Sequence, residues 1–207
     1  MCPSNEGKHM ATTTWVVTGV LGAAALVWAI AAYNRLVQLR NRIANAFGQI
    51  DVQLKRRHDL VPNLVEVARG YLQHEAATLE AVVQARGLAQ GAAAAARSAP
   101  ASAAALGALA VAEGALGGSL GRLMAVAESY PDLKADATMR VLSEELTSTE
   151  NRLGFARQAY NDEVLAFNND AAQFPTLIVA RLLGFAPAPM LESTRSEAER
   201  AAPRVQF

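Results

Sequence analysis

An uncharged stretch near the N-terminus, from residue 11 to residue 34, constrains this chain more than any other feature. Its apolar core, Trp15 to Tyr33, is nineteen residues long. As a helix at about 1.5 Å per residue it would cover roughly 28 Å, close to the ~30 Å hydrocarbon thickness of a bilayer. A soluble domain of this size has no use for a helix that is apolar on every side. We therefore predict a transmembrane helix over residues 13–34.

Aromatic residues and charges predict how this span is placed. Trp15 lies at one end, with Trp28 and Tyr33 near the other, where amphipathic rings favour the headgroup level. Only Glu6 and Lys8 carry charge before the span, whereas six cations and one acid follow it by residue 57. The positive-inside rule thus predicts a single-pass protein of the cell inner membrane, with a short external tail (1–12) and a cytoplasmic C-terminal part. The six cations are Arg35, Arg40, Arg42, Lys55, Arg56 and Arg57.

Two alternatives for the apolar stretch stay open. Ala29-Ile30-Ala31 offers an Ala-x-Ala cleavage site, but the run is long for a signal peptide and arginines follow it directly. Small residues four apart, Thr18 with Gly22 and Gly19 with Ala23, could bring two spans together. They equally fit the general abundance of small residues in membrane helices.

Apolar residues recur with helical spacing after the span. Leu36, Ile43 and Ile50 are seven apart, with further apolar residues between them, which predicts a first helix from about 13 to 57. The segment 58–63 contains Pro62, which predicts either a turn or a kink. An apolar face then continues to about Gln90.

The alanine-rich segment 91–105 contains Pro100 and predicts the tip of a helical hairpin, followed by a helix over 106–128. The strongest pattern comes next. An apolar residue stands at every seventh position from 139 to 174, with Asp136 as a plausible N-cap and Pro175 as the stop. These positions are Met139, Leu146, Leu153, Tyr160, Phe167 and Phe174.

The segment Thr176–Phe185 is short and apolar, and it would dock either on the end of a bundle or on the membrane surface. The tail 186–207 is rich in Pro, Glu and Arg, which predicts disorder. The fold class predicted is all-α: an N-terminal transmembrane helix followed by an elongated antiparallel bundle of long helices over residues 35–185.

Several ordered blocks resemble the LemA family. They are QIDVQLKRRHDLVPNLVEVARGYLQHE (49–75), GRLMAVAESYPDLKA (121–135), ELTSTENRLGFARQAYND (145–162) and QFP (173–175). Tyr33-Asn34 and Leu36-Val37 also look like the opening motif of that family. The resemblance covers roughly residues 30–185. It implies a bacterial membrane protein with an N-terminal anchor and a helical bundle, and it implies no defined reaction.

Catalytic and metal-binding patterns are absent from the sequence. His74-Glu75 lacks the second histidine of a zinc-protease motif, and the only Glu-x-x-His spacing, Glu6 to His9, falls on the N-terminal tail. The glycines between 114 and 121 have no Lys-Ser/Thr pair after them, so they do not form a phosphate loop. We expect no catalytic residue, cofactor or metal, and a zero net charge gives no case for nucleic acid.

Two groups of residues remain as candidate contact sites. The six cations after the span would touch anionic lipid or a protein partner, or would merely set the topology. Tyr71, His74 and Glu75 form a candidate polar cluster, which is either a ligand site or a structural set of hydrogen bonds. Asparagines near the last long helix, such as Asn161, are typical of residues that fix helix register.

The sequence therefore favours a non-enzymatic scaffold or protein-interaction module at the bacterial inner membrane, with membrane lipid and unidentified proteins as partners. A homo-oligomeric assembly that organises the membrane is the first alternative. A ligand-sensing or accessory component of an envelope stress or protease pathway is the second.

Overall fold

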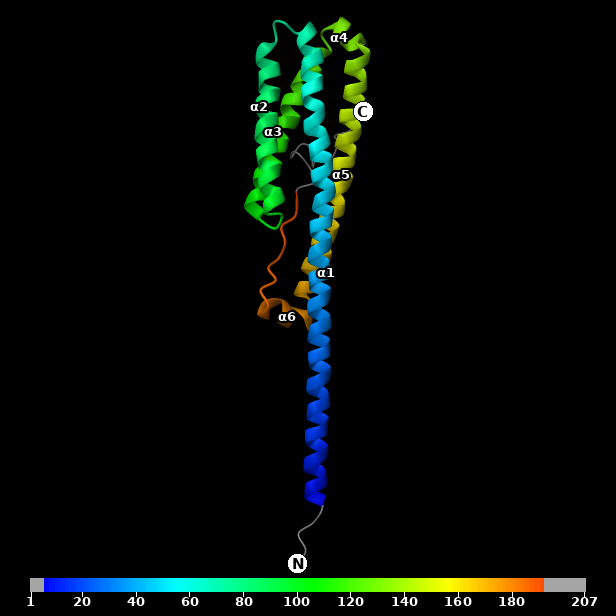
Figure 1. Cartoon of the computed structure of the whole chain (residues 1–207), viewed down its shortest axis with the longest axis vertical. Coiled ribbons are helices and arrows are strands. Elements are labelled where there is room, and N and C mark those ends of the chain that lie inside the picture. The colour runs from blue at the N-terminus through cyan, green and yellow to red at the C-terminus, as the bar shows by residue number, and fades with distance from the viewer. Residues whose placement is uncertain (1–5, 192–207) are drawn as a thin grey trace, which may run out of the picture. The chain divides into compact units, whose positions relative to one another are not determined.

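The computed structural model describes residues 6–191, with side chains from Thr13 onward. Within these residues the chain forms helices and no strand (Figure 1). The predicted all-α class is confirmed. The helices are α1 (Glu6–Tyr71), α2 (Ala76–Ser98), α3 (Ala103–Ala127), α4 (Pro131–Ala135), α5 (Ala137–Ala172) and α6 (Thr176–Leu182).

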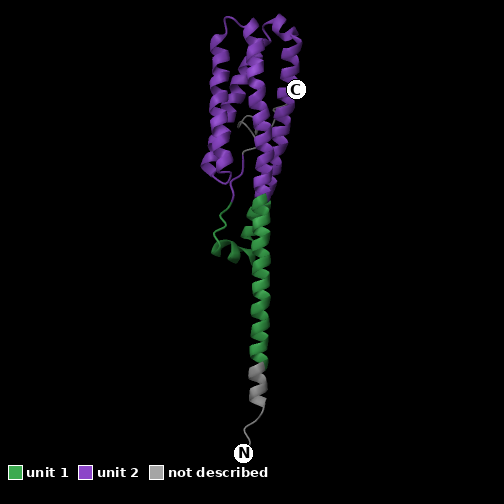
Figure 2. Cartoon of the chain, in the orientation of Figure 1, with its two compact units in different colours: residues 1–41, 166–187 green, residues 42–165, 188–207 purple. Residues whose placement is uncertain are grey.

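The chain divides into two compact units (Figure 2). Unit 1 combines residues 1–41 with 166–187, and unit 2 combines residues 42–165 with 188–207. Unit 1 therefore holds the N-terminal part of α1, the end of α5 and α6. Unit 2 holds the rest of α1 and α5 together with α2, α3 and α4.

Unit 2 is a bundle of four long helical segments. Early in this part of α1, the ring of Phe47 lies 6.2 Å from that of Tyr160. At the end of α1, the hydroxyl of Tyr71 donates to Asp136, the residue before α5. The partner on α5 moves backwards along the chain as the position on α1 moves forwards, so these two helices run antiparallel. Helices α2 and α3 pack against each other as a hairpin. The predicted antiparallel bundle is thereby confirmed for this unit.

The apolar stripes that the sequence indicated form the core. Leu36, Ile43 and Ile50 of α1 are buried, and so are the heptad residues of α5 from Met139 to Phe167. Phe174 departs from this pattern and is 80 % exposed, because α5 ends at Ala172 before the repeat is complete.

Of the two alternatives predicted for residues 58–63, the turn is wrong, because α1 continues through Pro62 to Tyr71. The second helix begins at Ala76, after a short connection that follows Tyr71. The hairpin tip is confirmed: α2 ends at Ser98, and the hydroxyl of Ser102 caps α3 by accepting from the amide of Ala105. Asp136 caps α5 as predicted, since its carboxylate accepts from the amide of Met139 at 2.8 Å.

In unit 1, α6 ends in a tight turn that directs the chain onto α1. Gly184 has a φ of 73°, a conformation that glycine adopts without steric cost. The amide of Phe185 donates to the carbonyl of Ala180 at 2.9 Å, which closes a Schellman motif. The Phe185 ring then lies 5.8 Å from that of Tyr33 and 6.3 Å from that of Phe167.

Residues 186–191 were predicted to be disordered, but the structure holds them along α5 within unit 2 from Ala188 onward. The side-chain amide of Asn161 donates to the carbonyl of Leu191 at 2.7 Å and accepts from its amide at 2.8 Å. The hydroxyl of Tyr160 donates to the carbonyl of Pro189 at 3.0 Å. Asn161 thus anchors the end of this segment. The rest of the predicted tail, 192–207, lies outside the described residues.

Candidate functional site

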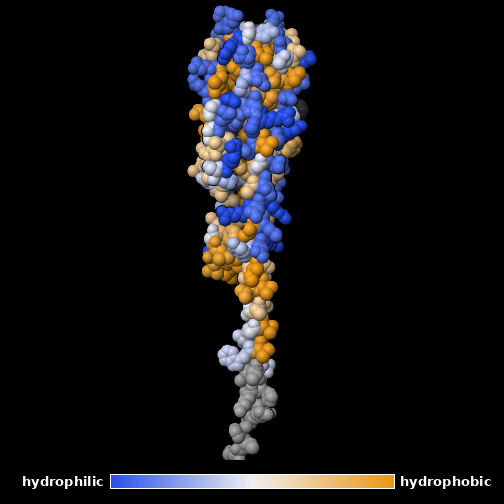
Figure 3. All heavy atoms as spheres, viewed as in Figure 1, coloured by the Kyte–Doolittle hydropathy of each residue, from blue (hydrophilic) through white to orange (hydrophobic). Residues whose placement is uncertain are grey.

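The N-terminal part of α1 exposes the apolar side chains that predicted a membrane span. Trp15 is 77 % exposed, and the valines and leucines between it and Tyr33 are exposed to similar extents. Figure 3 shows hydrophobic residues along this part of α1 and over α6. The helix is long and apolar enough to cross a membrane. Burial inside the protein does not account for so many apolar side chains, so this surface calls for a non-aqueous neighbour.

Helix α3 is also long and apolar enough to span a membrane. Its leucines, however, are buried against the bundle, and it carries the buried carboxylate of Glu113. Helix α3 therefore acts as a core helix of unit 2.

A buried ionic cluster joins three helices of unit 2. Arg57 and His58 of α1 are 1 % and 3 % exposed, and Glu113 of α3 is 3 % exposed. The Arg57 guanidinium donates from Nη1 to Glu113 Oε2 at 2.5 Å, and His58 Nε2 lies 2.7 Å from Glu113 Oε1. Because a carboxylate only accepts, His58 must carry its proton on Nε2 in this arrangement. Arg57 Nε also lies 2.8 Å from Glu150 of α5, an ion pair by distance that is not aligned as a hydrogen bond.

The electrostatics of the cluster favour an ionised Glu113. Burial alone would raise the pKa of this carboxyl, but the hydrogen bond with His58 and the charge of Arg57 outweigh it, and the pKa falls below its ordinary value of 4.5. Both carboxylate oxygens are occupied, as a buried charge requires. The arrangement binds three helices together and leaves little capacity to accept a further ligand.

A hydrogen bond from Arg86 to the main chain of His58 explains why α1 does not break at Pro62. Arg86 of α2 donates from Nε to the main-chain carbonyl of His58 at 2.7 Å. In an α-helix this carbonyl would accept from the amide four residues later, which is Pro62 and has no N–H. The Arg86 side chain supplies the missing donor.

The six predicted contact cations do not share one environment. Arg57 is buried in the cluster, so the prediction that it touches lipid is wrong. Lys55 pairs with Asp59 at 2.6 Å, and Arg56 lies 3.5 Å from Glu145. Arg35 pairs with the buried carboxylate of Asp170 at 2.8 Å, within unit 1. Arg40 and Arg42 are exposed, and neither has an acidic partner among the side chains that the structure describes.

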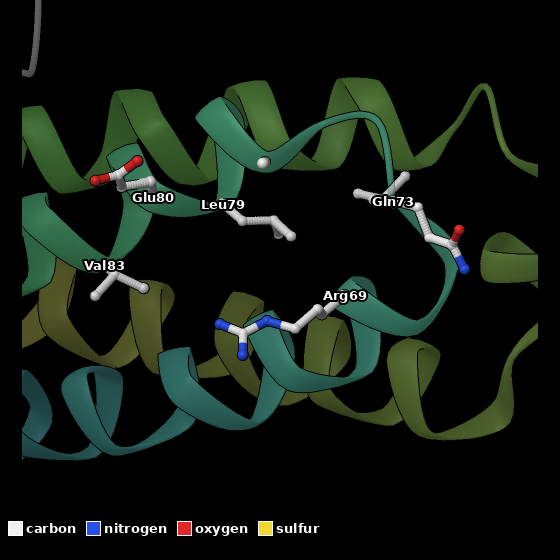
Figure 4. A pocket seen from close by; sticks show the side chains of 7 residues that line it. Arg69, Gln73, Leu79, Glu80 and Val83 are labelled. Atoms are coloured by element: carbon white, nitrogen blue, oxygen red, sulfur yellow. The ribbon is translucent and has the colours of Figure 1, made fainter.

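The predicted polar cluster does not gather at one place. Tyr71 donates to Asp136 at 3.1 Å, Glu75 accepts from Thr78 at 3.4 Å, and His74 is exposed. A depression of about 470 Å³ lies beside the connection between α1 and α2 (Figure 4). It is lined by Arg69, Leu72, Gln73, Ala76, Leu79, Glu80 and Val83, and by none of the three predicted residues. The hydrogen bonds match the structural alternative better than a shared ligand site.

Glu113 was not among the predicted site residues, although its position in the sequence carries a signal. Arg57 stands in the same seven-residue series as Ile50 and Leu64, and Glu113 stands in that of Leu106 and Leu120. A charge in an apolar stripe is buried with the stripe, and two such charges of opposite sign indicate a pair. Reading each heptad slot for charge would have found both residues.

Comparisons with known proteins give a matching family and several similar proteins. The model of the LemA family matches residues 46–207. Two similar proteins are Magnetosome protein MamQ 1 and Magnetosome protein MamQ 2 of Paramagnetospirillum magneticum, each 24 % identical over 198 residues, which cover 88 % of this chain and 73 % of the relative. Magnetosome protein MamQ of Magnetospirillum gryphiswaldense is 30 % identical over 69 residues, or 33 % of this chain and 25 % of the relative.

Proposed function

We propose that this chain, which belongs to the LemA family, is a membrane-anchored scaffold that presents its helical bundle to protein partners and catalyses no reaction. The observation that carries the proposal is the apolar surface of α1 from Trp15 to Tyr33, exposed along its length. A helix of this kind is stable in a bilayer, where its backbone polar groups are satisfied internally.

The charge distribution supports one orientation of the anchor. Five of the six cations after the span remain at or near the protein surface, since only Arg57 is buried. Exposed cations beside a span favour the cytoplasmic side of the inner membrane. In the proposed topology the N-terminus is therefore outside and the bundle is cytoplasmic.

The buried cluster supports a structural role for the bundle. Arg57 and His58 each bond to Glu113 inside the core, and the charged residues that reach the surface nearby are Lys55, Arg56 and Asp59. A bundle tied together in this way offers a fixed outer surface for binding.

The anchor is tested by placing a charge within the span. Leu21→Arg should lower the fraction of full-length protein that stays with membranes after an alkaline wash, since an arginine at the centre of a span costs about 2.5–3.5 kcal/mol on insertion scales. Leu88→Arg is the matched control, because Leu88 is 70 % exposed but belongs to α2 of the bundle. Equal membrane retention of the two variants would contradict the anchor.

The scaffold is tested by photo-crosslinking in cells from exposed positions of the bundle. Lys55, Arg56 and Phe155 are suitable, since all three side chains are exposed. Adducts with other proteins at these positions would support the scaffold. Lipid adducts alone at all three positions would refute the scaffold while leaving the anchor in place.

A homo-oligomer is the second candidate, and exposed apolar residues on α1 and α5 favour it. Phe155 is 73 % exposed and Val52 is 58 % exposed. The antiparallel pairs Phe47 with Tyr160 and Arg57 with Glu150 put these two residues at one level of the helix pair. Light scattering in detergent should then give more than one copy per particle, and Phe155→Ser should reduce that number. A monomer at all concentrations would remove this candidate.

A further inference from the structure

We propose that α6 and its flanking residues form a second membrane contact, which lies in the headgroup region of the bilayer at the end of the α1 span. The contact consists of Phe174, Ile178, Leu182 and Leu183, referred to here as the α6 apolar patch. This inference rests on the proposed anchor and adds to it a named surface outside the span.

Contacts within unit 1 set the level of α6 relative to the span. Tyr33 ends the apolar core of the span, and its ring packs edge-on against that of Phe185, three residues after α6. The pair Arg35 with Asp170 fixes the end of α5 beside the first charged residue after the span. Tyrosine and the first arginine after a span are residues typical of the headgroup level. The α6 apolar patch therefore lies beside the boundary of the bilayer.

The patch is apolar and exposed. Phe174 is 80 %, Leu182 79 %, Leu183 56 % and Ile178 49 % exposed. They are the large exposed hydrophobic residues that unit 1 has outside the span itself, among its described side chains. A contiguous group of exposed apolar side chains marks a contact with another protein or with a membrane.

The opposite face of α6 is packed, which holds the patch in place. Val179 and Ala180 are buried, and the turn at Gly184 directs Phe185 onto Tyr33 and Phe167. Ile178 and Leu182 are four residues apart and share a face of the helix. The patch is thus the outer face of an element whose inner face is already covered.

The charge of the segment favours a bilayer as the neighbour. Residues 171–185 contain one charged residue, Arg181, and no acid. Arg181 is exposed, in the last turn of α6 directly before the exposed Leu182 and Leu183. A short helix with apolar side chains and a cation suits the interface, where the guanidinium reaches anionic headgroups while the leucines enter the acyl boundary. Continuity with the span distinguishes this surface from the exposed Phe155 in unit 2.

The test measures immersion depth in the full chain. Spin labels are attached to single cysteines in a Cys2→Ser background, in nanodiscs of phosphatidylcholine and phosphatidylglycerol. The positions are Leu182→Cys in the patch, Leu21→Cys in the span and Phe155→Cys in the bundle, all of them exposed apolar sites. Relaxation by oxygen, which enters lipid, is compared with relaxation by a water-soluble nickel chelate.

The spin labels at positions 182 and 21 should be relaxed more strongly by oxygen than by the nickel chelate. The label at position 155 should be relaxed more strongly by the nickel chelate. If the label at 182 behaves as that at 155 while the label at 21 is in lipid, the α6 contact is overturned and the anchor stands. If the label at 21 is itself in water, the anchor fails and the contact fails with it. Dipolar broadening between two 182 labels would show a second copy on the patch, and would also overturn the lipid contact.

Discussion

Arg86 donates to the main-chain carbonyl of His58 at 2.7 Å, and this carbonyl is available because Pro62 cannot donate to it. A side chain from α2 thus completes the hydrogen bonding of α1. The contact joins the two helices and keeps α1 continuous at the position where the sequence alone indicates a break.

Arg86→Leu should destabilise the bundle, because it leaves the His58 carbonyl without a donor. The expected loss is about 1–2 kcal/mol, below the cost of a fully buried orphan group because Arg86 is only half-buried. Pro62→Ala supplies an amide to the same carbonyl, so in that background Arg86→Leu should cost much less. Denaturant unfolding of the full chain in detergent, followed by circular dichroism, gives all four free energies of this cycle. Equal costs in both backgrounds would contradict the proposed replacement.

Glu113→Gln should lower the free energy of unfolding substantially, because it removes the charge that faces the buried Arg57. Breaking a buried pair costs about 3–5 kcal/mol, and the low end applies here because Glu150 still faces the guanidinium. Asp59→Asn is the matched control, since its pair with Lys55 is exposed and should have no measurable effect. Comparable losses in the two variants would show that burial of the cluster does not matter.

Stability should fall on acidification below about pH 4.5. The pKa of Glu113 is lowered in the fold from its ordinary value of 4.5, so its contribution is present above that value and is lost as pH falls through the lowered pKa. In Glu113→Gln the dependence should be weaker. Some dependence should remain, because the amide of Met139 and the hydroxyl of Tyr71 also lower the pKa of Asp136. Unfolding at a series of pH values measures both slopes, and identical slopes would refute the assignment.

Asn161→Leu should release the segment that ends at Leu191. The variant loses two hydrogen bonds to the backbone of Leu191, each worth about 0.5–1.5 kcal/mol. Hydrogen exchange at the Leu191 amide should therefore accelerate roughly fivefold or more. Asn151→Leu, at an exposed position of the same helix, is the control and should leave this exchange unchanged.

Burial along α1 and α5 could be predicted from sequence because a seven-residue repeat places one stripe inward whatever packs on it. The end of α1 at Tyr71 could not be predicted from the sequence. Leu72 and Leu79 are both buried and seven apart, so the connection between α1 and α2 preserves the spacing of the stripe and hides the turn. The continuity of α1 through Pro62 depends on Arg86, whose contact with His58 is not local in sequence.

The candidate sites also include residues that could be predicted from the sequence and residues that could not. Exposure of Trp15, Trp28 and Tyr33 agrees with the predicted span, since an all-round apolar helix carries its signal within one segment. The sequence groups Arg57 with Lys55 and Arg56 as a possible lipid or partner contact, yet the turn of the helix directs Arg57 inward to Glu113. Neighbours in sequence lie on different sides of a helix, so a run of cations is not one patch.

Glu113 has a further consequence for the assembly of α3. The other inward residues of this helix are leucines and one alanine, and sliding α3 by seven positions would bring Leu109 to the position of Leu116 and Leu116 to that of Leu123. Such a slide would place the guanidinium of Arg57 against apolar side chains and move the carboxylate of Glu113 away from it. One acidic residue thus favours a single alignment of a helix whose other inward residues are leucine and alanine, and its removal should let competing alignments coexist.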